Sequence, residues 1–225
     1  MIASASSFRP RAEAAGQPPV LVIPGLDDSG NDHWQTLWHR DDANCQKVDL
    51  GMWDKPHRNT WVNKLNLAIH RAAENAGRPV VLVAHSLGCM AVAWWARLEQ
   101  PEHGSPVAGA LLVAPPEVDF FPRDERLSVF APTPSEPLPF TSIVVASRND
   151  PWMGFAGAQA LARRWGSELV DAGHAGHLNA ESDLGRWPDG RQLLARLIGE
   201  KQAPAASPVM AAARNGLVQA ATDGG

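Results

Sequence analysis

One short stretch constrains the fold more than any other: an apolar run that ends in a turn and continues at once into a helical pattern. Val80–Ala84 is apolar at every position, which is typical of a strand buried on both faces of a parallel sheet. The next twelve residues place apolar side chains at helical spacing, namely Leu87, Met90, Ala91, Trp94, Trp95 and Leu98. His85 and Ser86 must therefore form a sharp turn between a buried strand and a helix.

The same alternation runs through most of the chain. Six β-rich runs are visible: Val20–Ile23, Cys45–Leu50, Val80–Ala84, Val107–Val113, Thr141–Ala146 and Glu168–Val170. Helical patterns lie between them, including one that Asp32 is expected to cap with Gln35 reciprocating, and a last one that runs from Pro188 to Gly199. Strands that alternate with helices predict an α/β fold with a doubly wound, mostly parallel sheet of about six strands.

The two ends of the chain differ from its middle. The length of 225 residues suits one domain, and we expect that domain at 18–200. Residues 1–17 and 201–225 are rich in Ala without a period, so we expect both to be mobile tails.

Composition excludes several classes of function. A formal net charge of −4 gives no footprint for nucleic acid, and no apolar run approaches the ~18–20 residues of a membrane span. Cys45 and Cys89 are expected to be buried free thiols, and the N-terminus lacks a secretory pattern, so we expect a cytoplasmic protein. Neither a metal-ligand spacing nor a phosphate-binding or dinucleotide motif stands out, so no metal and no cofactor is expected.

The turn at Ser86 has the form of a nucleophile elbow, in which a strained strand-to-helix turn exposes a serine hydroxyl above the sheet. Gly88 fits the second glycine of the G-x-S-x-G pattern, whereas Ala84 replaces the first. The alternative is that Ser86 only caps the helix. His85 adjoins the serine, and we expect it to pack or to orient its neighbours, because the base must approach from another loop.

Candidates for the acid and the base follow later strands, in the chain order that an α/β-hydrolase fold requires. Asp150 follows the run that ends at Ala146, and His174 and His177 follow the run that ends at Val170. Asp119 and Asp124 are alternative acids after the preceding strand.

Each residue type has a chemical reason to be there. A serine hydroxyl needs an imidazole to take its proton, and the imidazole needs a carboxylate to fix its tautomer. Backbone N–H groups must stabilise the oxyanion. We expect these donors to be Leu87, directly after the serine, and Leu26, in the loop after the first strand.

Several segments together resemble the compact serine hydrolases related to retinoblastoma-binding protein nine. The resemblance spans about residues 18–199 and is carried by Ile23-Pro24-Gly25-Leu26, Asp32-His33-Trp34-Gln35, Ala84-His85-Ser86-Leu87-Gly88, Ser147-Arg148-Asn149-Asp150-Pro151 and Gly176-His177-Leu178-Asn179-Ala180-Glu181-Ser182. It implies a single-domain α/β hydrolase without a cofactor, whose triad is Ser86, Asp150 and His177. The chain has no L-x-C-x-E segment, so a retinoblastoma-type partner is not implied.

We therefore predict a serine hydrolase that acts on small carboxylic esters through an acyl-enzyme on Ser86. The same triad also serves a thioesterase, a transacylase or a peptidase, and the fold alone would also suit a non-catalytic interaction module. The residues expected to line the substrate pocket are His33, Trp34, Trp53 and Trp152. The alternative for His33 is that it simply belongs to the first turn of a helix, without a role in the pocket.

Seven prolines in residues 114–140 leave room for one short helix near Asp124–Phe130, so we expect a minimal lid or none. A lid this small predicts acyl chains of roughly two to six carbons, because each methylene contributes up to ~0.8 kcal/mol only where a wall buries it. Phe120, Phe121 and Phe130 would form either a shallow apolar ledge beside Ser86 or part of the packing on the sheet.

Overall fold

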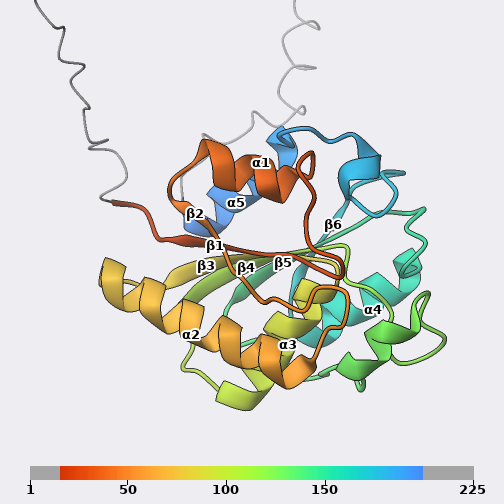
Figure 1. The fold of residues 1–225 in the computed structure, drawn as a ribbon, viewed down its shortest axis with the longest axis horizontal. Helices are drawn as coiled ribbons and strands as arrows, with labels where there is room; N and C mark the ends of the chain where they lie inside the picture. Colours follow the sequence, from red (N-terminus) through yellow and green to blue (C-terminus); the bar gives the residue numbers. More distant parts are fainter. Residues whose placement is uncertain (1–15, 200–225) are drawn as a thin grey trace, which may run out of the picture.

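The computed structural model describes residues 16–199, which form a parallel sheet with helices on both faces (Figure 1). The strand order is β2-β1-β3-β4-β5-β6, and every neighbouring pair is parallel. This arrangement confirms the doubly wound α/β architecture. The strands are β1 (Val20–Ile23), β2 (Cys45–Lys47), β3 (Val80–His85), β4 (Val107–Val113), β5 (Thr141–Ala146) and β6 (Glu168–Asp171).

Helices cover the two faces unequally. Helices α1 and α5 lie on one face, and α2, α3 and α4 lie on the other (Figure 1). Each face therefore has its own apolar core, with the sheet between them. The helices are α1 (Trp34–Asp41), α2 (Arg58–Ala76), α3 (Leu87–Glu99), α4 (Phe155–Trp165) and α5 (Pro188–Ile198), with short 3-10 helices η2 (Glu125–Phe130) and η3 (Ala180–Ser182).

Strand β3 is the centre of both cores. All six of its residues are buried, and alternate side chains point to opposite faces. Val81 and Val83 pack with α1 and α5, whereas Leu82 and Ala84 pack with α2 and α3. The uniformly apolar sequence of Val80–Ala84 is explained by the absence of a solvent-facing side.

The chain changes direction across the sheet between β1 and β3. From β1 it moves outward to β2 and then returns to the other side of β1 to form β3. Ligands of open parallel sheets bind beyond the carboxyl ends of the strands at such a point. The elbow serine follows β3 directly, so this topology places it at that edge.

The start of α1 differs from the prediction. The N-cap is His33, whose Nδ1 accepts the backbone N–H of Gln35 at 3.1 Å, so Asp32 as the cap was wrong. An unprotonated imidazole nitrogen is an acceptor that can replace a carboxylate at this position. The Gln35 side chain instead donates to the carbonyl oxygens of Ile23 and Val83, both at 3.1 Å, and so ties α1 to β1 and β3.

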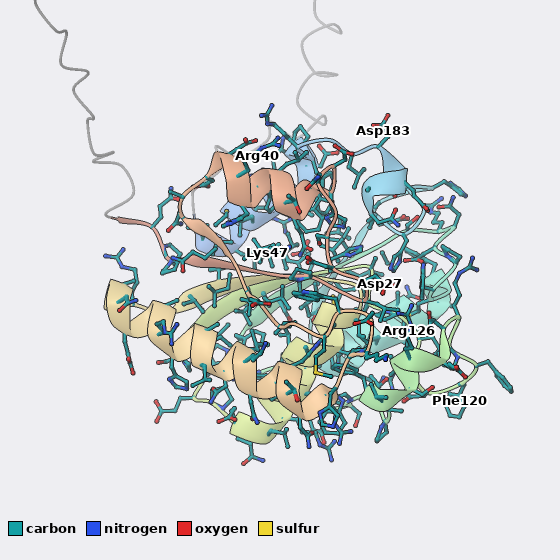
Figure 2. The ribbon with its side chains drawn as sticks, viewed as in Figure 1. Asp27, Arg40, Lys47, Phe120, Arg126 and Asp183 are labelled. Atoms are coloured by element: carbon teal, nitrogen blue, oxygen red, sulfur yellow. The ribbon has the colours of Figure 1, made fainter. Side chains whose placement is uncertain are left out.

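Residues 114–140 contain one short helix, η2, as the prolines predicted. Phe130 is fully buried and packs edge-on against Trp61. Phe120 and Phe121 are exposed, and Figure 2 shows Phe120 projecting outward. The apolar ledge beside the serine was therefore wrong, because one Phe is in the core and the other two point to solvent.

The predicted tails lie almost wholly outside the described residues, which begin at Gly16 and end at Gly199. Within this range, no helix combines the length and apolar character that crossing a membrane requires. Cys45 and Cys89 are both buried and free, as predicted.

Candidate active site

Ser86 occupies a strained turn between β3 and α3. Its φ of 52° and ψ of −127° are unfavourable for a residue with a Cβ, and its N–H donates to the carbonyl of Val113 at 2.9 Å. Ser86 makes no side-chain cap bond to α3, so the alternative in which it only caps the helix is wrong. Backbone strain at a polar residue that does not cap its helix is typical of a functional turn.

Two glycines allow the turn to pack tightly. A Cβ on Gly88 would lie 2.5 Å from the carbonyl oxygen of Pro24, and one on Gly25 would lie 2.8 Å from the Cβ of Ser86. Atoms cannot approach this closely, so both positions require glycine. The loop after β1 therefore lies directly against the elbow.

Ser86, His177 and Asp150 form a continuous hydrogen-bonded chain. The Nδ1–H of His177 donates to the carboxylate of Asp150, with distances of 2.9 and 3.0 Å to its two oxygens. Because a carboxylate only accepts, this bond leaves Nε2 as the acceptor of the neutral ring. The Ser86 hydroxyl lies 2.9 Å from that nitrogen and donates to it.

The acid and base loops are joined by side chains that the sequence reasoning did not single out. Ser147 accepts the N–H of Ala175 at 2.9 Å, and Asn149 accepts the N–H of Gly176 at 2.8 Å. These bonds fix the backbone immediately before His177. The sequence signals were their position beside Asp150 at the end of β5 and their place in the segment Ser147-Arg148-Asn149-Asp150-Pro151, which carries the family resemblance.

The alternative acids and the alternative histidine have other environments. The carboxylate of Asp119 accepts the N–H of Thr133, and that of Asp124 pairs with Arg126. His174 is exposed, whereas His177 is buried. Of the predicted alternatives, the structure therefore brings only Asp150 and His177 to Ser86.

His85 supports the loop that carries His177. Its Nε2–H donates to the backbone carbonyl of His177 at 2.9 Å, and its ring lies between those of His33 and His177. Burial, followed by the nearby His33 and His177, holds the pKa of His85 well below its ordinary value. A neutral ring at this position agrees with the prediction that His85 orients its neighbours.

A pocket of about 260 Å³ opens above Ser86. Leu26, Asp28 and His33 line it from the first loop and its helix cap, and Trp152 lines it from beyond β5. The Trp152 ring stacks on that of His177, with ring centres 5.2 Å apart. The pocket is smaller than the range of about 300–1,000 Å³ that is usual for drug-sized ligands.

Two predicted lining residues do not reach this pocket. Trp34 is fully buried and donates its Nε1–H to the carbonyl of Leu178 at 2.8 Å. Trp53 packs edge-on against Trp61. Trp34 faces the sheet, where it meets Trp38 one helical turn away, so the prediction that Trp34 and Trp53 line the pocket was wrong.

The described part of the chain contains no cluster of three or more His, Cys, Asp or Glu side chains that could share a metal ion.

Comparison with known proteins identifies the family. The model of the family described as serine hydrolase matches residues 20–196. The chain belongs to the serine hydrolase family. A search of curated proteins gave no match.

Solved structures give the fold of this serine hydrolase. A YdeN-like hydrolase from Pectobacterium atrosepticum is 33% identical, with 84% of this chain and 94% of that chain covered and a TM-score of 0.72. The ydeN gene product of Bacillus subtilis is 22% identical, with 81% and 99% covered and a TM-score of 0.65. A thermophilic esterase from Thermogutta terrifontis is 14% identical, with 80% and 90% covered and a TM-score of 0.60. The fold is that of the α/β hydrolases, as predicted, whereas the resemblance to retinoblastoma-binding protein nine stays a prediction.

Proposed function

We propose that this serine hydrolase cleaves small carboxylic esters through an acyl-enzyme on Ser86. One observation carries the proposal: the hydrogen-bonded chain from the Ser86 hydroxyl through His177 to the buried carboxylate of Asp150. A neutral imidazole that accepts from the hydroxyl is ready to act as a general base. The carboxylate holds the tautomer and stabilises the imidazolium that forms.

The reaction follows from these contacts. As the Ser86 oxygen attacks the ester carbonyl, its proton moves to Nε2 of His177, and a tetrahedral oxyanion forms. The imidazolium returns this proton to the leaving alcohol, and the C–O bond breaks to give an acyl-enzyme. Water then attacks the acyl group with the same base, which releases the acid and restores the serine.

Two backbone N–H groups are suited to the oxyanion. Leu87 is the first residue of α3, where an N–H has no partner within the helix. Leu26 lines the pocket that contains Ser86, in the loop that Gly25 holds against the elbow. Preorganised donors of this kind stabilise charge as it develops in the transition state.

The size of the pocket supports small acyl groups. Phe120, Phe121 and Phe130 are all absent from its lining, and residues 114–140 supply one short helix, η2, rather than a helical lid. A longer acyl chain would leave its distal methylenes in water, where they add nothing to binding. We infer a best fit for acyl chains of about two to six carbons, because the benefit of each methylene ends where the wall ends.

The test is a series of esters of one alcohol with acyl chains of increasing length. We expect kcat/KM to rise over the short chains and then level or fall, and hydrolysis to disappear in Ser86→Ala. Continued rise through long chains, or activation at a lipid interface, would contradict the proposed substrate size. Higher kcat/KM on matched thioesters or peptides would replace the ester assignment by one of those activities.

A further inference from the structure

Two buried polar atoms in the active-site pocket have no hydrogen-bond partner among residues 16–199. They are Nε2 of His33 and Oδ1 of Asp28, and no other buried side-chain nitrogen or oxygen in that range is unpaired. Both residues line the pocket that contains Ser86. Because leaving a buried polar group without a hydrogen bond is costly, its persistence at a site needs an explanation.

The proton on His33 can be placed from its contacts. Nδ1 accepts the N–H of Gln35 at the start of α1, so it carries no proton. The proton of the neutral ring is therefore on Nε2, which is a donor. Burial, with a smaller effect of His177, lowers the pKa of His33 from 6.5 to about 4. The ring, with only 4% of the residue exposed, stays neutral near neutral pH.

Asp28 offers the complementary group. Its Oδ2 accepts from the ammonium of Lys47 at 2.8 Å, which fixes the carboxylate in place. Its Oδ1 is left as a charged acceptor. Asp28 and His33 line the same pocket of about 260 Å³, so the acceptor and the donor belong to one small site.

We propose that Asp28 and His33 form a subsite that binds a hydroxyl group of the ester substrate. A hydroxyl suits the pair because it donates to Oδ1 and accepts from Nε2–H at the same oxygen. A carboxylate at this place would meet the charge of Asp28, and an ammonium group would offer nothing for Nε2–H to donate to. This inference rests on the proposed ester hydrolase function and names its substrate class, a short hydroxylated ester.

The test uses pairs of esters of equal shape. Ethyl β-hydroxybutyrate is compared with ethyl isovalerate, and hydroxyethyl butyrate is compared with propyl butyrate. The first pair places the hydroxyl in the acyl part and the second in the alcohol part. We expect wild-type kcat/KM to favour the hydroxylated member of at least one pair by about tenfold, the size expected for a hydrogen bond to a charged group.

Variants then separate binding from folding. His33→Asn keeps a side-chain acceptor for the cap of α1 but removes Nε2–H, and Asp28→Ala removes the acceptor. We expect each change to bring the kcat/KM ratio of the pair close to one. Asp32→Ala, the matched control, removes an exposed carboxylate next to His33 in the sequence that does not line the pocket, and it is expected to keep the wild-type ratio.

Three results would overturn the subsite: no preference for the hydroxyl in either pair, equal loss on both members of a pair in His33→Asn and Asp28→Ala, or loss of the ratio in Asp32→Ala as well. Failure of the proposed function is read separately, because it would appear as wild-type protein that does not hydrolyse the unsubstituted esters.

Discussion

The two sides of the candidate active site are held in different ways. On the side of the acid and base, residues 147–150 and 173–177 are joined by backbone N–H groups that donate to the side chains of Ser147 and Asn149. On the side of the loop after β1, ion pairs dominate. Arg126 pairs with Asp27 and Lys47 with Asp28, and Figure 2 shows Asp27 beside Arg126 at the surface.

We therefore assign different roles to the two sides: the acid and base side carries out the reaction, and the loop after β1 modifies its rate. The contact between His177 and Asp150 is short, and only 7% and 3% of the two side chains are exposed, so salt cannot weaken it much. The ion pairs of the first loop are partly exposed, with 34% and 58% of the Arg126 and Asp27 side chains accessible, and such pairs are screened by salt. We expect changes on the first side to abolish turnover, and changes on the second side to modify it.

The largest effect is expected on the base side. His177→Ala removes the general base, so kcat should fall by ~10³-fold or more, leaving only binding and oxyanion stabilisation. His174→Ala, an exposed histidine three residues earlier, should retain activity. Steady-state kinetics on a short ester compare the two, and an inactive His174→Ala beside an active His177→Ala would reverse the assignment.

The contact between the loop after β1 and the elbow can be broken at Gly88. In Gly88→Ala the new Cβ would meet the carbonyl oxygens of Ile23 and Pro24 at 2.6 and 2.5 Å, and backbone must move. We expect a loss of about 3 kcal/mol in the free energy of unfolding. Gly154→Ala is the control, since nothing lies within 4 Å of its Cβ. Equal urea midpoints for the two variants would show that the elbow is looser than described.

Acid should destabilise the protein through His33. Its pKa is about 4 in the folded state and 6.5 otherwise, so the unfolded chain binds the proton more readily. The resulting stabilisation is complete above pH 6.5 and is lost as the pH falls toward 4. Between about pH 7 and pH 5, the free energy of unfolding of the wild type should fall by about 2 kcal/mol more than that of His33→Asn. Urea unfolding of both proteins at both pH values measures this, and parallel losses would contradict it.

The smallest effect is expected at the ion pairs of the first loop. Arg126→Gln should lower kcat/KM by up to about fivefold, because exposed pairs contribute about 0–1 kcal/mol. High salt should lower the kcat/KM of the wild type and leave that of the variant nearly unchanged. Arg97→Gln, which breaks a pair with Glu136 on the surface, is the control. Equal salt dependence in wild type and Arg126→Gln would mean that these ion pairs do not hold the loop.

Much of the fold could be predicted because buried strands and helices carry apolar residues at regular spacings in the sequence. Apolar runs marked the six strands, and the structure shortens only β2 appreciably, to Cys45–Lys47. The N-cap of α1 could not be read correctly, because Asp32 is the common cap residue while the cap used is a histidine nitrogen. Composition shows which residues can accept a hydrogen bond, but only the backbone path decides which one does.

The candidate site was predicted unevenly for a similar reason. The order in which polar residues follow the strands singled out Ser86, Asp150 and His177. In the structure, their side chains lie within hydrogen-bond distance of one another in sequence along the chain Ser86–His177–Asp150. Trp34 was misplaced, because the face of a short helix depends on packing with distant residues. The unpaired atoms of Asp28 and His33 had no sequence signal, since whether a polar atom finds a partner is a property of the three-dimensional arrangement.

The central claim is that Ser86 is the nucleophile, and covalent labelling tests it most directly. A fluorophosphonate probe reacts with an activated serine, and peptide mapping by mass spectrometry identifies the residue that it modifies. We predict one adduct, on the peptide that contains Ser86, and no adduct in Ser86→Ala. Labelling of Ser86→Ala at the wild-type level, or an adduct on another residue of the wild type, would contradict the account.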